Sequence, residues 1–169
     1  MPNDFITLNA LSKELESAVS GGKIDKISMP EADEINIHIR KGGENLILAL
    51  SANAQNPRIH LTTVRKTNPL TAPAFCMRLR KCLSGGVING VSMLGNDRIF
   101  NFSVTARNEL RDEVIYSVIA ETMGRYSNIL LVNSNGIIKD TLKQASFDTA
   151  TKRCLLPSVK YELPPRNKI

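Results

Sequence analysis

Asp97 and Arg98 are adjacent residues whose side chains are suited to bind another molecule. A carboxylate that accepts hydrogen bonds stands next to a guanidinium with a rigid fork of donors, and such a pair can address a base edge and a phosphate. The pair stands at the predicted entrance of a strand, where successive side chains face opposite sides. Both side chains can therefore meet one ligand only if the backbone turns there. The alternative is a turn aspartate followed by a solvated arginine.

The sequence carries no pattern typical of an enzyme or a metal site. His38 and His60 stand singly on predicted strands, without a cysteine or carboxylate at ligand spacing, so we expect no metal and no cofactor. No GxSxG, GxGxxG or P-loop pattern occurs. The Gly-Gly pairs at 21–22 and 85–86 are interpreted as helix stops. We therefore expect no enzymatic activity of the domain itself.

The stretch around the Asp-Arg pair is written twice, 64 residues apart. Residues 15–34 read LESAVSGGKIDKISMPEADE, and residues 79–98 read LRKCLSGGVINGVSMLGNDR. Nine of the 25 positions aligned between residues 15–39 and 79–103 are identical, which is far above chance. We interpret the chain as a duplicated unit of helix, glycine stop and antiparallel strands. Glu34 of the first copy is replaced by Arg98 in the second.

Hydrophobic periodicity places the secondary structure. Helices are predicted over about 8–20, capped by Thr7, and over 72–83. Strands are predicted over 23–29, 35–40, 45–51, 58–62, 87–94, 99–106, 114–121, 129–132 and 137–142. Asn135-Gly136 indicates a type I′ hairpin turn. From Gln144 onward the periodicity fades, which predicts a tail without a core of its own.

The predicted fold class is α+β. Two pseudo-repeated halves, each a helix and about four strands, are expected to pack into an antiparallel β-sandwich over residues 1–155. Residues 156–169, with prolines at 157, 164 and 165, are interpreted as a Pro-rich linker to further domains. The predicted core consists of Leu8, Leu11, Leu15, Ile24, Ile27, Ile37, Ile59, Leu61, Phe75, Leu79, Leu83, Ile88, Val91, Ile99, Val118, Ile129 and Leu131.

The two copies differ in which residues of one strand are apolar. Apolar residues occupy positions 35, 37 and 39 in the first copy, whereas in the second copy Phe100, Phe102 and Val104 are apolar, one position later than the repeat predicts. Because side chains alternate between faces, this is a change of parity. A bulge or bend beside Arg98 would accommodate it and would re-aim the side chains there.

The composition limits the environment and the partners. The chain has 22 basic and 16 acidic residues and a net charge of +6, which favours a polyanionic partner, with plain solubility as the alternative. Arg78, Arg80 and Lys81 form either a basic helix face or the solvated side of an amphipathic helix. The three cysteines show no CxxC spacing, which is typical of reduced thiols in a cytoplasm. There is neither an apolar run of membrane-helix length nor a signal peptide, so no membrane partner is expected.

Several motifs in order resemble the N-terminal domain of the NFACT family. They are ITLNAL, VSGGKIDKI, LSANAQNPRIHLT, FCMRLRKCLSGG, GNDRI, ETMGRYSNILLV and the closing LPP, and they extend from Phe5 to Pro165. Members of this family are ribosome quality-control factors, often labelled fibronectin-binding proteins. Thr7 departs from the eukaryotic members, which have an aspartate at this position, so no functional role is transferred to it.

The resemblance implies a cytoplasmic RNA-binding protein. Such a protein binds large ribosomal subunits obstructed by peptidyl-tRNA and recruits tRNA, alanyl-tRNA in bacteria, so that the nascent chain is extended without a template. The family's Asp-Arg pair, required for tRNA recognition, falls on Asp97 and Arg98. The ETMGRYSN segment is expected near the same anticodon-loop surface. Its residues with expected supporting roles are Glu121, Met123, Gly124, Arg125 and Asn128.

Two other functions remain open at this point. The fold of the family resembles the N-terminal domain of formamidopyrimidine-DNA glycosylases, whose nucleophile is an N-terminal proline followed by a catalytic glutamate. Removal of Met1 would expose Pro2, but the next residue is Asn3, which cannot transfer protons as a carboxylate does. The third function is adhesion to fibronectin through surface display of the protein.

Overall fold

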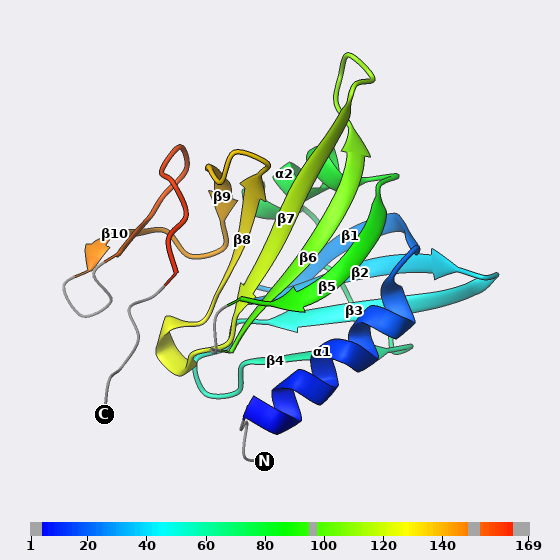
Figure 1. Ribbon diagram of the computed structural model, residues 1–169, viewed down its shortest axis with the longest axis horizontal. Helices are drawn as coiled ribbons and strands as arrows, with labels where there is room; N and C mark the ends of the chain where they lie inside the picture. Colours follow the sequence, from blue (N-terminus) through cyan, green and yellow to red (C-terminus); the bar gives the residue numbers. More distant parts are fainter. Residues whose placement is uncertain (1–4, 95–97, 149–152, 164–169) are drawn as a thin grey trace.

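The computed structural model describes residues 5–94, 98–148 and 153–163, with side chains for all of these except 5–8 and 145–148. The chain forms two α-helices, one 3-10 turn and eleven strands within this part (Figure 1). In order they are α1 (Phe5–Val19), β1 (Lys23–Glu31), β2 (Glu34–Lys41), β3 (Glu44–Ser51), β4 (Arg58–Thr62), α2 (Ala74–Leu83), β5 (Val87–Met93), β6 (Ile99–Arg107), β7 (Glu113–Glu121), η1 (Gly124–Tyr126), β8 (Asn128–Asn133), β9 (Ile138–Thr141), β10 (Ala145–Asp148) and β11 (Arg153–Leu155). The helix predicted to begin after Thr7 already includes this residue. None of the helices in the described part is long and apolar enough to span a membrane.

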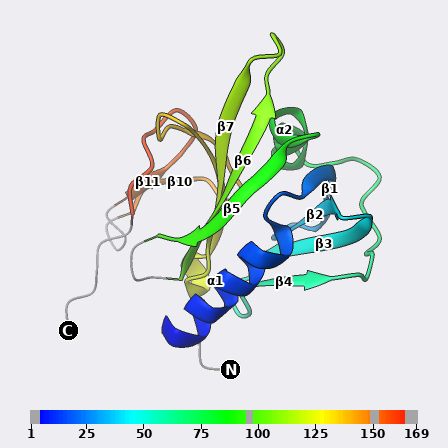
Figure 2. The same cartoon turned by 45° about the vertical axis from the view of Figure 1, so that its right-hand side comes forward.

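Nine strands form one antiparallel sheet in the order β4-β3-β2-β1-β5-β6-β7-β8-β9. Strands β1–β4 run across strands β5–β8, so the sheet folds over on itself at the β1/β5 junction (Figures 1 and 2). Helix α1 packs against β5, whereas α2 packs against β1, β6 and β9. Each helix therefore contacts the first strand of the half of the chain to which it does not belong.

The junction between the halves is made by the two Gly-Gly segments. The N–H of Gly21 donates to the carbonyl of Ile88 (2.7 Å), and the N–H of Gly85 donates to the carbonyl of Ile24 (2.9 Å). The N–H of Ile24 donates to the carbonyl of Gly86 (2.8 Å), and the N–H of Ile88 donates to the carbonyl of Gly22 (2.9 Å). Each hydrogen bond donated by the first segment thus has a counterpart donated by the second segment, with donor and acceptor each shifted by 64 positions. Gly21 and Gly85 have φ angles of +83° and +79°, which glycine adopts without strain.

The α+β class is confirmed, but the arrangement of the strands differs from the prediction. The halves join edge to edge through β1 and β5 in one continuous sheet, rather than forming two separate sheets of a sandwich. The second half also contributes five strands, β5–β9, instead of about four. The glycine junction explains the difference, because it pairs the two strand edges that a sandwich would leave apart.

The main core lies between the two arms of the folded sheet and beneath the helices. It contains most of the residues predicted to be buried: Leu15, Ile24, Ile27, Ile37, Ile59, Phe75, Leu79, Leu83, Ile88, Val91, Val118, Ile129 and Leu131. Leu11 and Leu61 are half-buried against it, and the side chain of Leu8 lies outside the described residues. Cys76 is fully buried there and its Sγ lies 3.7 Å from the carbonyl of Ile27.

A second apolar cluster covers the opposite face of β6–β9. It is formed by Ile99, Ile119, Leu130, Val132, Ile138 and Leu155, the last from β11. The segment after Gln144 therefore has no separate core but contributes Leu155 to the cluster on the sheet. Strands β10 and β11 pair with each other, and the N–H of Tyr161 donates to the carbonyl of Gly136. The predicted linker from 156 onward thus begins as a segment bonded to the sheet.

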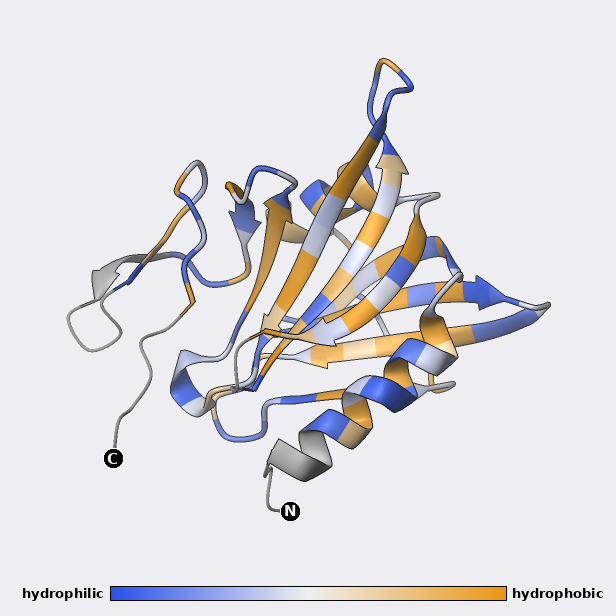
Figure 3. Cartoon of the chain, in the orientation of Figure 1, coloured by the Kyte–Doolittle hydropathy of each residue, from blue (hydrophilic) through white to orange (hydrophobic). Residues whose placement is uncertain are grey.

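The parity difference between the two segments is observed, and Arg98 lies in a bend, as predicted, while residues 95–97 beside it lie outside the described residues. Phe100, Phe102 and Val104 face the main core, while Ile99 faces the second cluster. The alternation is visible along β6 in the hydropathy colouring (Figure 3). Strand β6 pairs with β7 in regular register from Ile99 to Arg107. The register shift between β5 and β6 at Asn89 has a counterpart at Asp25 between β1 and β2, so it does not cause the parity difference. Ile88 pairs with Val104 whereas Ile24 pairs with Ile39, so the second segment has one residue more between these partners.

The hairpin between β8 and β9 has a different turn from the type I′ turn predicted. A type I′ turn needs positive φ at both central residues. Gly136 has φ +81°, but Asn135 does not have a positive φ. The side-chain oxygen of Asn133 instead accepts hydrogen bonds from the N–H groups of Asn135 (3.0 Å) and Ile137 (2.9 Å), which stabilise the turn from outside it.

Candidate functional site

Arg98 is an exposed residue at the start of β6, and its backbone is fixed by the chain that follows β7. Its carbonyl oxygen accepts two hydrogen bonds from Thr122, from the N–H at 2.9 Å and from Oγ1 at 2.8 Å. The structure thus places the backbone of Arg98 beside Thr122, at the start of the segment 122–128. Asp97 lies outside the described residues.

The segment between β7 and β8 is a short turn that presents a second exposed arginine. Gly124 has φ +58° and begins η1, whose turn is closed by hydrogen bonds from Tyr126 N–H to the carbonyl of Met123 (3.0 Å) and from Ser127 N–H to that of Gly124 (3.1 Å). Met123 is half-buried and packs against the second apolar cluster. The turn is the yellow segment at the lower left of Figure 1.

The side chains of Arg125 and Tyr126 form a cation–π pair at the tip of this turn. The guanidinium carbon of Arg125 lies 4.9 Å from the centre of the Tyr126 ring, and Nη2 donates to the Tyr126 hydroxyl at 2.8 Å. Arg125 is exposed. A cation stacked on an aromatic ring offers both a charge for a phosphate and a planar surface for a base.

Asn128 closes the turn from inside and is buried. Its Oδ1 accepts from the N–H groups of Ile129 and Lys143, both at 2.9 Å, and its Nδ2 donates to the carbonyl of Lys143 at 2.8 Å. Lys143 in turn donates from Nζ to the carbonyl of Ala52 at 2.7 Å. The polar atoms of Asn128 are therefore used within the protein, and its role is to hold the turn.

Glu121 is also buried, and its carboxylate is shared by two residues of the C-terminal segment. Arg153 makes a forked contact with it, Nη1 to Oε2 at 2.7 Å and Nη2 to Oε1 at 2.9 Å. The Tyr161 hydroxyl donates to Oε2 at 2.6 Å. Glu121 is 1% exposed and Arg153 is 4% exposed. Both carboxylate oxygens of Glu121 are therefore bonded within the protein, and the residue ties the chain before the turn to the C-terminal segment.

The buried charges shift the titration of their partners. Burial and then the Glu121 carboxylate raise the pKa of Tyr161 well above its usual range, which keeps the hydroxyl protonated as a donor. For Arg153, burial acts to lower the pKa, but the hydrogen bond and charge of Glu121 outweigh it and raise the pKa. Sequence reasoning missed Arg153 and Tyr161. The available signal was a cation followed directly by apolar residues in the segment RCLL.

The first half uses the positions equivalent to Asp97 and Arg98 for internal contacts. Asp33 accepts a hydrogen bond from Asn53 Nδ2 at 3.0 Å, and Glu34 is 8% exposed and pairs with Lys66 at 2.8 Å. Position 34, which the sequence comparison aligns with Arg98, is therefore a buried glutamate in an ion pair rather than an exposed arginine.

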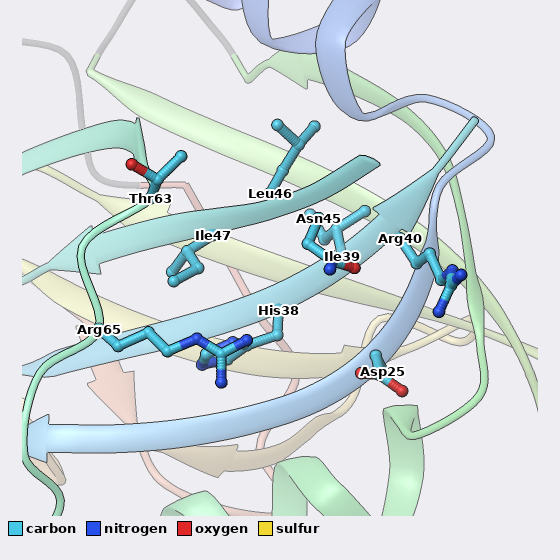
Figure 4. A pocket seen from close by; sticks show the side chains of 9 residues that line it. All are labelled: Asp25, His38, Ile39, Arg40, Asn45, Leu46, Ile47, Thr63 and Arg65. Atoms are coloured by element: carbon cyan, nitrogen blue, oxygen red, sulfur yellow. The ribbon is translucent and has the colours of Figure 1, made fainter. Parts of the chain in front are cut away.

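A polar cavity on the first half contains none of the predicted site residues. It measures about 300 Å³ and is lined by Asp25, His38, Arg40, Arg65 and neighbouring side chains (Figure 4). Burial, followed by the charges of Lys26 and Arg65, lowers the pKa of His38, so its ring is neutral at pH 7. The lining contains one carboxylate, Asp25, and two guanidinium groups, Arg40 and Arg65, so it favours neither an anionic nor a cationic ligand.

Comparison with known proteins identifies relatives over almost the whole chain. Residues 4–169 match the family described as NFACT N-terminal and middle domains. Proteins named Rqc2 homolog RqcH are 40% identical in Bacillus subtilis (strain 168) and 37% identical in Streptococcus suis (strain 05ZYH33), each over 98% of this chain. The chain spans 29% and 30% of the length of these two relatives.

Solved structures share the fold closely. The N-terminal domain of fibronectin-binding protein PavA from Streptococcus pneumoniae has a TM-score of 0.92 at 36% identity, covering 96% of this chain and 62% of that one. The N-terminal part of the fibronectin/fibrinogen-binding protein from Streptococcus suis has a TM-score of 0.93 at 36% identity, covering 98% and 62%.

Proposed function

Since the chain belongs to the NFACT family of N-terminal domains, we propose that it is the tRNA-binding domain of a ribosome quality-control factor. In this proposal the full-length protein recruits tRNA, alanyl-tRNA in bacteria, to large ribosomal subunits that hold a stalled peptidyl-tRNA, and the nascent chain is extended without a template. The names of the relatives support the setting. The protein acts in the cytoplasm.

The observation that carries the proposal is the attachment of Arg98 to the turn that presents Arg125. The carbonyl of Arg98 is bonded twice to Thr122, three residues before Arg125. Two exposed arginines thereby lie at one end of the sheet, and the guanidinium of Arg125 is stacked on the Tyr126 ring. Guanidinium groups bind phosphate oxygens and base edges through two parallel hydrogen bonds, and an aromatic ring stacks on an unpaired base.

Each predicted site residue has a role in this proposal. Arg98 and Arg125 donate to the RNA, and Asp97 accepts from a base or fixes Arg98. Met123 and Gly124 shape the turn, while Glu121 and Asn128 position it from inside. The domain reads RNA and performs no reaction, because the ribosome supplies the chemistry of peptide-bond formation.

The experiment is tRNA binding by the full-length protein on isolated large subunits, for wild type, for the double variant Asp97→Ala with Arg98→Ala, and for a matched Arg58→Ala variant. Arg58 is an exposed arginine on β4, in the first half. We expect the double variant to dock on the subunit and lose tRNA, and Arg58→Ala to keep it. Two salt concentrations separate phosphate contacts from other contacts. Unchanged tRNA recruitment by the double variant would refute the site.

Adhesion is a second candidate, supported by the fibronectin-binding names of the solved relatives. A fibronectin-binding domain would keep its affinity for fibronectin in the Asp97/Arg98 double variant, whereas tRNA binding would be lost. If the wild-type protein binds both tRNA and fibronectin, and the double variant loses only tRNA, the domain has two separate binding surfaces.

We also propose that the two halves of the domain arose by duplication. The reciprocal hydrogen bonds at the glycine junction support an origin by duplication, in which the second half alone acquired the exposed arginine. The likeness to formamidopyrimidine-DNA glycosylases stays a prediction. Pro2, the nucleophile that such an activity would need, lies outside the described residues, and blocking the N-terminus tests it.

A further inference from the structure

A cleft lined by basic side chains lies at the end of β6 far from Arg98. Arg78 and Lys81 reach it from α2, Arg107 from the end of β6, and Lys139 from β9. The cleft measures about 330 Å³. Four cations from three elements that are distant in sequence thus converge on one space.

The acidic side chain in the lining of this cleft offsets little of the charge. Glu109 lies 3.2 Å from Lys81, but it is 81% exposed, and exposed pairs of this kind are weak and screened by salt. Arg80, which sequence analysis grouped with Arg78 and Lys81, does not join them, because its Nε donates to the carbonyl of Ile27 at 2.7 Å. Of the three cations on α2, Arg78 and Lys81 therefore line the cleft, which β6 and β9 complete.

The wall of the cleft formed by the β6–β7 hairpin is held in a fixed shape. Asn108 Oδ1 accepts from the N–H groups of Leu110 and Asp112, both at 2.9 Å. Arg107 Nη1 donates to the carbonyl of Arg111 at 3.0 Å, which orients its guanidinium along the wall. Leu110 at the tip of the hairpin is 82% exposed. A preorganised set of donors loses less conformational entropy on binding than free surface lysines do.

We propose that this cleft is a second RNA-binding site that takes the phosphate backbone. It extends the proposed function, on which it rests, because a single RNA that contacts both ends of β6 is held at two points. From Arg98 to Arg107 the strand rises about 3.3 Å per residue, so the two sites are about 30 Å apart. A folded RNA helix covers such a span, and Lys and Arg bind its phosphates without reading sequence. The RNA is either the tRNA or the ribosomal RNA of the large subunit.

The test compares two triple variants of the full-length protein that remove the same charge. One is Arg78→Gln, Lys81→Gln and Lys139→Gln in the cleft, which leaves Arg107 and the hairpin intact. The matched control is Lys13→Gln, Lys23→Gln and Lys26→Gln, three exposed lysines on α1 and β1. Affinities for purified tRNA and for isolated large subunits are measured over a range of salt concentrations, with polyglutamate as a competitor. Thermal unfolding establishes that both variants fold.

We expect the cleft variant to bind tRNA or the subunit at least about tenfold more weakly, and its salt slope to fall by about one for each phosphate that it no longer binds. The control should change both quantities much less. Weakening confined to tRNA, or to the subunit, identifies the source of the phosphates. Equal behaviour of the two triple variants would overturn the proposal, and so would competition by polyglutamate as strong as by RNA. Absence of tRNA binding by the wild-type protein would instead refute the proposed function, and normal tRNA binding by Arg98→Ala would refute only the site at Arg98, whatever the cleft variant does.

Discussion

The hydroxyl of Tyr161 lies 2.6 Å from Oε2 of Glu121, the residue that precedes the Thr122 bonded to Arg98. Forty positions along the chain separate the two residues. This contact joins the C-terminal segment to the chain that leads into the turn presenting Arg125, so residues 40 positions away support the candidate RNA surface.

We expect Tyr161→Phe to destabilise the domain by about 1–3 kcal/mol, because a buried carboxylate loses a charge-assisted donor. The free energy of unfolding in urea measures the loss. Tyr126→Phe serves as a control, since the hydroxyl of Tyr126 bonds only to the exposed Arg125 in the part of the chain described here. Equal stability of Tyr161→Phe and wild type would contradict the role given to this contact.

Arg153→Met should cost more, about 3–5 kcal/mol, because it leaves the buried charge of Glu121 without its cation. Adding Glu121→Gln to this variant removes the uncompensated charge and should recover part of the loss. A double-mutant cycle built from unfolding free energies checks this. Additive losses would mean that the two side chains stabilise the domain independently.

Arg125→Ala should weaken tRNA binding roughly tenfold while leaving the unfolding temperature within about 1 °C of wild type, since the side chain is exposed. Arg125→Lys should restore the affinity only in part, because an ammonium cannot form the planar stack or the forked contact. Titration of labelled tRNA measures both. Full recovery with lysine would show that only the charge at this position matters.

Gly22→Ala and Gly86→Ala should each destabilise the junction of the halves by about 1–3 kcal/mol. A Cβ at Gly22 would overlap Ile39 and lie 2.9 Å from the carbonyl oxygen of Val19, and one at Gly86 would lie 2.8 Å from Val104 and 2.9 Å from the carbonyl oxygen of Leu83.

Gly90→Ala is the matched control for these two substitutions. Its Cβ would meet only the flexible end of Glu16 at 3.1 Å, so we expect a smaller loss. Urea unfolding of the three variants checks the order, and a loss at Gly90 as large as at Gly22 would contradict it.

The stability of the domain should fall as the pH drops below about 6.5. Burial, together with neighbouring cations, lowers the pKa of His38 and of His60, so the folded state binds fewer protons than the unfolded state. The stabilisation is complete above the unfolded pKa and is lost as the pH falls through the folded one. His38→Gln should reduce the slope of unfolding free energy against pH. An unchanged slope in both His38→Gln and His60→Gln would contradict this assignment.

Local signals in the sequence predicted the elements well, and long-range pairing explains what they missed. Alternation in Ile35–Ile39 and the Gly-Gly stops placed strands and helix ends, because these depend on neighbouring residues. Nothing local indicates that β1 pairs with β5, since that contact joins residues 64 positions apart. Arg98 was predicted as a candidate from the chemistry of the Asp-Arg pair, whereas the turn at 122–128 was predicted only through a family resemblance. The burial of Glu121 was not, because its partner Arg153 lies in a segment without periodicity.

The exchange of helices between the halves has a consequence for the order of folding. Helix α1 packs mainly against β5, so a nascent chain that has been synthesised only as far as β4 lacks the main partner of this helix. Strand β1 likewise lacks its contacts with α2 and β5 until these elements have been synthesised. Contacts between residues so distant in sequence make folding slow, and neither half reaches its native core alone. We therefore expect both halves to fold in a single cooperative step, after residues 87–93 have been synthesised.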